Sequence, residues 1–157
     1  MVWRLVKHTT PLFDEVLEFY RSVLGLRVHR RREEAALLGA LRPLVLLERG
    51  EERLKGGHIY HVAFRVPTRE DLAAFVKWAL RRFPEYVEGF ADHLVSEAAY
   101  LTAPDGVGVE IYADRPRSRW IYAGERPVMD ILPLDMSSLP AVGERALPPG
   151  TTIGHLH

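Results

Sequence analysis

The sequence predicts a mixed α+β chain in which one unit, a strand followed by a helix and three strands, occurs twice before an extended tail. Three observations carry this prediction. Two stretches place apolar residues at helical spacing, each is followed by three short strand-like runs, and six prolines lie beyond residue 114. A unit that recurs along a chain is typical of a duplicated fold.

Composition sets the broad class. A chain of 157 residues with 47% hydrophobic and 27% charged residues is typical of one soluble globular domain. Its 21 basic residues balance 21 acidic ones, which argues against a nucleic-acid or membrane-surface partner. The chain has no cysteine, so disulfides and thiolate chemistry are excluded. With no signal peptide and no apolar run long enough to span a bilayer, a cytoplasmic location is expected.

In the first unit we expect the helix to begin at Thr10, with Pro11 at its first helical position and Gly25 at its end. Its apolar stripe consists of Phe13, Val16, Leu17, Tyr20 and Leu24. Strands are expected at residues 26–29, 35–38 and 44–48, with a charged hairpin turn at 30–34 and a polar linker at 50–57.

The second unit opens with a strand near residues 58–66. Thr68 and Asp71 then fit a helix-capping box, although Asp replaces the usual Glu or Gln. The helical stripe consists of Leu72, Phe75, Val76, Ala79, Leu80 and Phe83. Strands are expected near 86–90, 98–102 and 107–112, followed by a proline-rich tail or linker over 116–157 that ends like the opening of a further strand.

His61 and Glu110 are the candidate site residues that strand alternation singles out. Because Val62, Phe64 and Val66 share one face of their strand, His61 points to the opposite face. Glu110 lies opposite Val109 and Ile111 in the same way. If both apolar faces pack on a helix, the imidazole and the carboxylate both point away from it, as two of the three ligands of a two-His-one-carboxylate iron site would.

Several stretches resemble the vicinal oxygen chelate superfamily, which includes glyoxalases, bleomycin-resistance proteins and extradiol dioxygenases. The closest resemblance is to the N-terminal half of catechol-2,3-dioxygenase-like proteins. The similar stretches are FYRSVLGL at 19–26, IYHVAF at 59–64, ADHLVSE at 91–97, APDG at 103–106 running on to EIYADRP at 110–116, and LPPGTTIGH at 147–155.

The resemblance implies two βαβββ modules, at about 1–50 and 57–115, that form a cupped mixed sheet with the helices outside. It places metal ligands at the start of a module's first strand and on its last strand, where His61 and Glu110 lie. The first module offers Val2, Arg4 or Leu5 and Leu46 at these points, and His8 lies in the wrong part of its strand. The third ligand that the resemblance offers is His155, since Gly154-His155 resembles the start of the next module.

Three further residues have candidate roles near this pair. Tyr112 shares the face of Glu110, and His93 lies beside a strand end; each is a candidate catalytic acid or base. Arg65 shares the face of His61 and either binds an anionic substrate or pairs with Glu110.

Three classes of function remain open. The first is an Fe(II)-dependent extradiol dioxygenase, or its N-terminal half, that cleaves a small aromatic diol. The second is a glyoxalase-type metal-dependent isomerase or lyase. The third is a metal-free small-molecule-binding protein of the bleomycin-resistance type, whose cup is formed between chains. The cofactor is accordingly Fe(II), another divalent metal or none, and assembly into a homo-oligomer is left open.

Overall fold

The computed structural model of the chain describes residues 4–51 and 61–156, except for the side chains of residues 155 and 156. Within these ranges the strand–helix–three-strand module occurs twice, as the sequence predicts. The first module comprises β1 (Val6–Thr10), α1 (Phe13–Glu18), β2 (Arg27–Arg32), β3 (Ala35–Gly39) and β4 (Pro43–Arg49). The second comprises β5 (His61–Arg65), α2 (Arg69–Arg82), β6 (Val87–Asp92), β7 (Ser96–Thr102) and β8 (Gly108–Asp114). Val2 and most of the expected linker at 50–57 lie outside the described residues.

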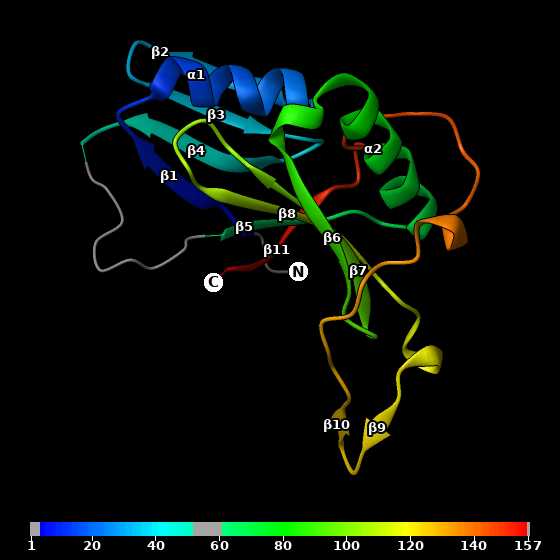
Figure 1. The fold of residues 1–157 in the computed structure, drawn as a ribbon. Helices are drawn as coiled ribbons and strands as arrows, with labels where there is room; N and C mark the ends of the chain where they lie inside the picture. The colour runs from blue at the N-terminus through cyan, green and yellow to red at the C-terminus, as the bar shows by residue number, and fades with distance from the viewer. Residues whose placement is uncertain (1–3, 52–60, 157) are drawn as a thin grey trace.

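Each module forms its own sheet. The strand order is β1-β4-β3-β2 in the first and β5-β8-β7-β6 in the second, and in each the opening strand runs parallel to the closing one. Helix α1 lies against the first sheet and α2 against the second (Figure 1). The same topology in both halves confirms the predicted pair of βαβββ modules.

The apolar core lies between each sheet and its helix. Val62, Phe64, Val109 and Ile111 are fully buried and belong to one large cluster that also includes core residues of the first module and of α2. Because strand residues alternate between faces, the other face of β5 and β8 is left for polar side chains. This face, the helix-free face of the second sheet, carries the candidate site.

The first helix begins later than the sequence predicts. Thr10 is the last residue of β1, and its hydroxyl accepts a hydrogen bond from the backbone N–H of Leu12, 3.1 Å away. The first helical hydrogen bond joins the N–H of Val16 to the carbonyl of Leu12, so Pro11 is not the first helical residue. The predicted helix start at Thr10 is wrong. A Thr whose hydroxyl bonds the backbone in a turn after a strand has the same local sequence pattern as a helix cap.

The end of this helix follows the prediction. After Glu18 the chain continues as a π-helical turn, η1 (Phe19–Val23), and the left-handed residue Gly25 (φ +75°) closes it. The N–H of Leu26 donates to the carbonyl of Tyr20 at 2.9 Å, a reverse bond one residue longer than that of a Schellman motif, in keeping with the π-helical turn. A Cβ at Gly25 would also overlap Ala146, so glycine is needed here for two reasons.

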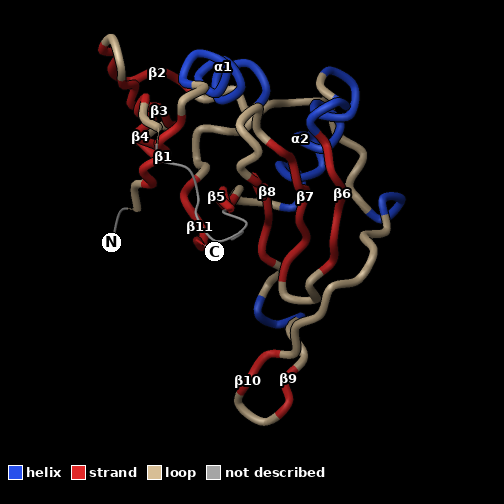
Figure 2. Tube along the Cα trace, turned by 60° about the vertical axis from the view of Figure 1, so that its left-hand side comes forward, coloured by secondary structure: helices blue, strands red, loops and turns tan. Residues whose placement is uncertain are grey.

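The residues after β8 form a long excursion with little regular structure. It contains the single turns η3 (Arg117–Arg119) and η4 (Met136–Ser138) and a short hairpin of β9 (Tyr122–Ala123) and β10 (Arg126–Pro127). The hairpin projects away from the modules in both views (Figures 1 and 2). The chain then returns as β11 (Thr152–Leu156), which pairs antiparallel with β5 on the side that faces the first module (Figure 2). No helix among the described residues is long and apolar enough to span a bilayer.

Candidate functional site

His61 and Glu110 lie on neighbouring parallel strands and on the same face. β5 and β8 pair in register, with His61 opposite Gly108 and Ala63 opposite Glu110. Val62 and Val109, their neighbours, are fully buried on the helix side. His61 is half-buried, whereas only 4% of Glu110 is exposed. The sheet therefore places an imidazole and a shielded carboxylate on its helix-free face, as alternation predicts.

Gly108 leaves the space that the imidazole of His61 occupies. A Cβ at Gly108 would overlap Cδ2 and Nε2 of His61, so this edge of the ring lies directly over the glycine. Any larger residue at position 108 would push the imidazole off the sheet. The glycine thus fixes the position of the candidate ligand from the neighbouring strand.

Tyr100, which sequence reasoning missed, connects the carboxylate to His93. It lies directly opposite Glu110 on β7 and donates a hydrogen bond to it. The Nε2 atom of His93 lies 2.6 Å from the hydroxyl of Tyr100, and its Nδ1 atom lies 3.0 Å from the carbonyl oxygen of Asp130. The rings of His61 and Tyr100 also meet edge to face, with centroids 6.4 Å apart. Tyr100 is thus the centre of a polar cluster formed with His61, His93 and Glu110.

Tyr100 keeps its proton over the whole physiological range. Burial raises the pKa of its phenol, and the charge of Glu110 and the hydrogen bond to it raise it further, to about 12. A phenol that stays neutral beside a carboxylate serves as a fixed hydrogen-bond donor. Strand alternation in β7 indicates that Tyr100 lies on the helix-free face, since Tyr100 and Ala98 share the face opposite Ala99 and Leu101.

The first module has no ligands at the equivalent positions. The pair Val6–Val45 in β1 and β4 corresponds to the pair Val62–Val109 in β5 and β8. This register makes Leu5 the counterpart of His61 and Leu46 the counterpart of Glu110, as expected from the sequence. Neither leucine offers a ligand atom, so the described part of the first module lacks a metal site at this point.

His8 is the counterpart of Phe64 and faces the core. It is 3% exposed, with Nδ1 2.7 Å from the hydroxyl of Tyr20 and Nε2 2.7 Å from Oδ2 of Asp105. Burial alone would raise the pKa of Asp105, but the hydrogen bond and charge of His8 outweigh it, and the pKa is lowered. Asp105 belongs to the β7–β8 turn, so this polar triad, His8–Tyr20–Asp105, joins the two modules through the core.

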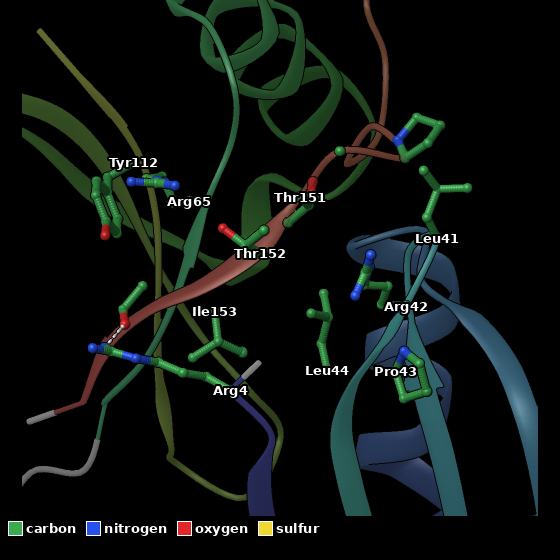
Figure 3. Close-up of a pocket in the computed structure, with 13 residues that line it drawn as sticks. Arg4, Leu41, Arg42, Pro43, Leu44, Arg65, Tyr112, Thr151, Thr152 and Ile153 are labelled. Atoms are coloured by element: carbon green, nitrogen blue, oxygen red, sulfur yellow. Dashed lines mark hydrogen bonds between the residues drawn. The ribbon is translucent and has the colours of Figure 1, made fainter. Parts of the chain in front are cut away.

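Arg65 and Tyr112 lie farther along the helix-free face. They oppose each other on β5 and β8, and Thr152 of β11 extends the row on the other side of Arg65. The guanidinium of Arg65 forms an ion pair with Asp114 at 3.4 Å, whereas Glu110 is hydrogen-bonded to the hydroxyl of Tyr100. A Cβ at Gly154 would overlap the phenol of Tyr112, and Figure 3 shows Tyr112 beside Arg65. Arg65 and Tyr112 thus lie at the other end of β5 from His61.

The described residues hold two of the three expected metal ligands. No group of three or more His, Cys, Asp or Glu residues placed to hold a metal occurs among them. The backbone of His155 lies in β11, next to β5, but its side chain is outside the described residues. His155 therefore remains a prediction as the third ligand.

The duplicated βαβββ fold defines a member of the vicinal oxygen chelate class. The Glyoxalase/Bleomycin resistance protein/Dioxygenase superfamily matches residues 8–111, and the chain belongs to this superfamily. A catechol-2,3-dioxygenase of Bacillus subtilis (strain 168) is 39% identical over 166 aligned positions, which cover 96% of this chain and 56% of that protein. The chain thus spans little more than half the length of this curated relative.

Solved structures share the fold at lower identity. A lactoylglutathione lyase from Agrobacterium tumefaciens superposes with a TM-score of 0.57 at 19% identity, covering 72% of this chain and 92% of that one. A glyoxalase/bleomycin resistance protein/dioxygenase from Alicyclobacillus acidocaldarius gives a TM-score of 0.60 at 17% identity, covering 78% and 96%. These similarities establish the architecture alone.

Proposed function

We propose that the chain is a catechol-2,3-dioxygenase-like unit, an extradiol ring-cleavage dioxygenase or its N-terminal half. The observation that carries the proposal is the placement of His61 and Glu110 side by side on the helix-free face of the second sheet. The 39% identity to a catechol-2,3-dioxygenase supports it. The substrate class is a small aromatic diol.

The donor chemistry fits Fe(II) in part. One neutral imidazole and one carboxylate are two members of the facial triad that holds this ion, and His155 is the proposed third. When bound, Fe(II) supplies open positions for the two neighbouring oxygens of a catecholate and for dioxygen. With only two ligands a divalent metal would bind weakly.

The chain's own residues then orient the ligands and carry protons. Gly108 holds the ring of His61 in place, and Tyr100 fixes one side of the Glu110 carboxylate through its hydrogen bond. Glu110, Tyr100 and His93 form a continuous hydrogen-bonded path from the site toward the end of β6. Tyr112 on the same face and His93 at the far end of this path are the proposed proton donors or acceptors.

An anaerobic Fe(II) titration of the purified chain tests this proposal. We expect about one iron per chain in the wild type, binding lost in His61→Ala, and binding retained in His29→Ala. His29 is the matched control, because it lies on β2 of the first module, where its Nε2 contacts the carbonyl of Ala40. Oxygen uptake with catechol then reports ring cleavage. Absence of iron binding in the wild type would contradict the enzymatic proposal for this chain.

A metal-free small-molecule-binding protein is the second candidate. It is favoured by the leucines at the ligand positions of the first module and by the absence of a three-ligand group among the described residues. A glyoxalase-type isomerase or lyase is less well supported, since it needs a fuller set of ligands. The same titration separates the metal-free function from both metal-dependent ones, and catechol cleavage separates the dioxygenase from the isomerase.

A further inference from the structure

A cavity of about 650 Å³ opens where β11 meets the first module, away from His61 and Glu110. Its walls come from Arg4 ahead of β1, the β3–β4 turn with the start of β4, the ends of β5 and β8, and β11 (Figure 3). A volume of this size is in the range of small-molecule sites. His61, His93, Tyr100 and Glu110 do not line it.

The charge of the lining has one sign. Arg4, Arg42 and Arg65 contribute three guanidinium groups, and none of the described lining residues is acidic. Arg4 and Arg65 line the cavity together with Tyr112, which lies opposite Arg65 on the neighbouring strand. Asp114 approaches Arg65 at 3.4 Å from outside the lining and offsets one of these three charges. The local charge is therefore positive.

The remaining lining is apolar or donates hydrogen bonds. Leu44 and Ile153 are buried and lie on the two sides of the cavity, from the first module and from β11 (Figure 3). Tyr112 adds a phenolic hydroxyl to the lining. Thr152 adds an exposed hydroxyl in the same row as Arg65 and Tyr112.

The walls are held in place before any ligand arrives. The N–H of Leu41 donates to the carbonyl of Pro149 at 3.1 Å, which joins the β3–β4 turn to the segment that leads into β11. Arg4 donates to the carbonyl of Gly154, and β11 is paired with β5. A preformed wall lowers the entropic cost of binding.

We propose that this cavity binds small organic anions, with the oxyanion beside Arg4 and Arg65 and the apolar body against Leu44 and Ile153. Guanidinium groups match carboxylate and phosphate oxygens in a two-pronged geometry, so both oxyanions belong to the class. The proposal goes beyond catechol chemistry and needs no metal at His61 and Glu110.

Calorimetry on EDTA-treated protein at low ionic strength tests the proposal. The probes are 3-phenylpropionate and its neutral counterpart 3-phenylpropanamide, with phenyl phosphate to distinguish carboxylates from phosphate esters. We expect the carboxylate or the phosphate ester to bind at least about ten-fold more tightly than the amide. Loss of a hydrogen bond to a charged group changes the dissociation constant by about this factor. Added salt weakens anion binding.

Arginine variants locate the binding. We expect Arg65→Gln and Arg4→Gln each to weaken binding of the anionic probe about ten-fold and to leave amide binding unchanged. Both residues are exposed, so thermal unfolding should show that the fold is retained. Arg30→Gln, an exposed arginine on β2 outside the cavity, is the matched control. Equal binding of anion and amide, or an equal loss in Arg30→Gln, would overturn the proposal. The metal-free assay also separates its failure from failure of the iron titration.

Discussion

At the residue scale, the second module gains its polar cluster by placing single polar groups among small or apolar neighbours. Tyr100 connects Glu110 to His93, and Gly108 leaves room for the ring of His61. In the first module a polar residue occupies a core position instead. His8 takes the place that Phe64 has in the repeat, and it is accommodated because Tyr20 and Asp105 satisfy both ring nitrogens.

Removing His8 alone should be strongly destabilising. In His8→Phe the carboxylate of Asp105 keeps its burial but loses its cationic or hydrogen-bonding partner, which costs about 3–5 kcal/mol for a broken buried pair. The double variant His8→Phe/Asp105→Leu should recover much of this loss, since replacing both partners by apolar groups is often close to neutral. Urea unfolding followed by tryptophan fluorescence measures both values, and equal stability of the single and double variants would contradict the assignment.

The contribution of Asp105 to the free energy of unfolding depends on pH with a definite sign. The folded-state pKa of Asp105 is lowered from its ordinary value of 3.8, so its stabilising contribution is present above that value and disappears as the pH falls through the folded pKa. Asp105→Asn should therefore lose less stability than the wild type between neutral pH and acid. Unfolding midpoints measured across that range test this, and parallel curves for the two proteins would contradict it.

Tyr100 should titrate later than an ordinary tyrosine. Because its pKa is raised to about 12, mainly by burial and then by Glu110, the wild type should show a phenol ionisation that is absent in Tyr100→Phe. The stability linked to this group is present below the unfolded value of 10.0 and is lost as the pH rises through about 12. Difference absorbance between the two proteins measures the ionisation. In Glu110→Gln the pKa should move back toward 10.0, and no movement would argue against the contact.

At the element scale, periodicity predicted the helices and strands well, and the errors have identifiable causes. The caps at Gly25 and Thr68 were recognised because each depends on its own residue type. The start of α1 was misplaced because Thr10 bonds locally as a turn residue after β1. Alternation in β7 indicates the face of Tyr100 but not its pairing with Glu110, since cross-strand register cannot be read from one strand.

The cap of α2 offers a direct measurement at this scale. The hydroxyl of Thr68 accepts a hydrogen bond from the N–H of Asp71 at 3.1 Å and donates to its carboxylate at 2.9 Å. Thr68→Ala should lower the free energy of unfolding by about 1 kcal/mol, while Thr68→Ser, which keeps the oxygen, should change it little. Denaturant unfolding gives both values, and an equal loss in the two variants would assign the effect to packing of the methyl group.

At the scale of the whole molecule, the two modules share one core. The buried cluster includes residues of both, the triad His8–Tyr20–Asp105 links β1 and η1 to the β7–β8 turn, and the indole N–H of Trp78 donates to the carbonyl of Val23 at 2.9 Å. None of these links between modules could be predicted from the sequence, because each pairs residues far apart in the chain. Only the similarity of the two units indicated that they would pack together.

These links predict one cooperative unfolding transition. We expect far-ultraviolet circular dichroism, which reports secondary structure, and tryptophan fluorescence to give the same urea midpoint. Trp78 belongs to the second module and contacts the first, so its emission reports the junction. Two separated midpoints in the wild type would show that the modules unfold independently.

The position of β11 has a consequence for the order of folding. Arg65 and Thr152 pair across the sheet although most of the second module lies between them in the chain. Closing so long a loop is entropically costly until the intervening residues are compact. We therefore expect β5 to acquire its second neighbour last, after both modules have formed. The row of Thr152, Arg65 and Tyr112, and the cavity with it, is completed only in that final docking step.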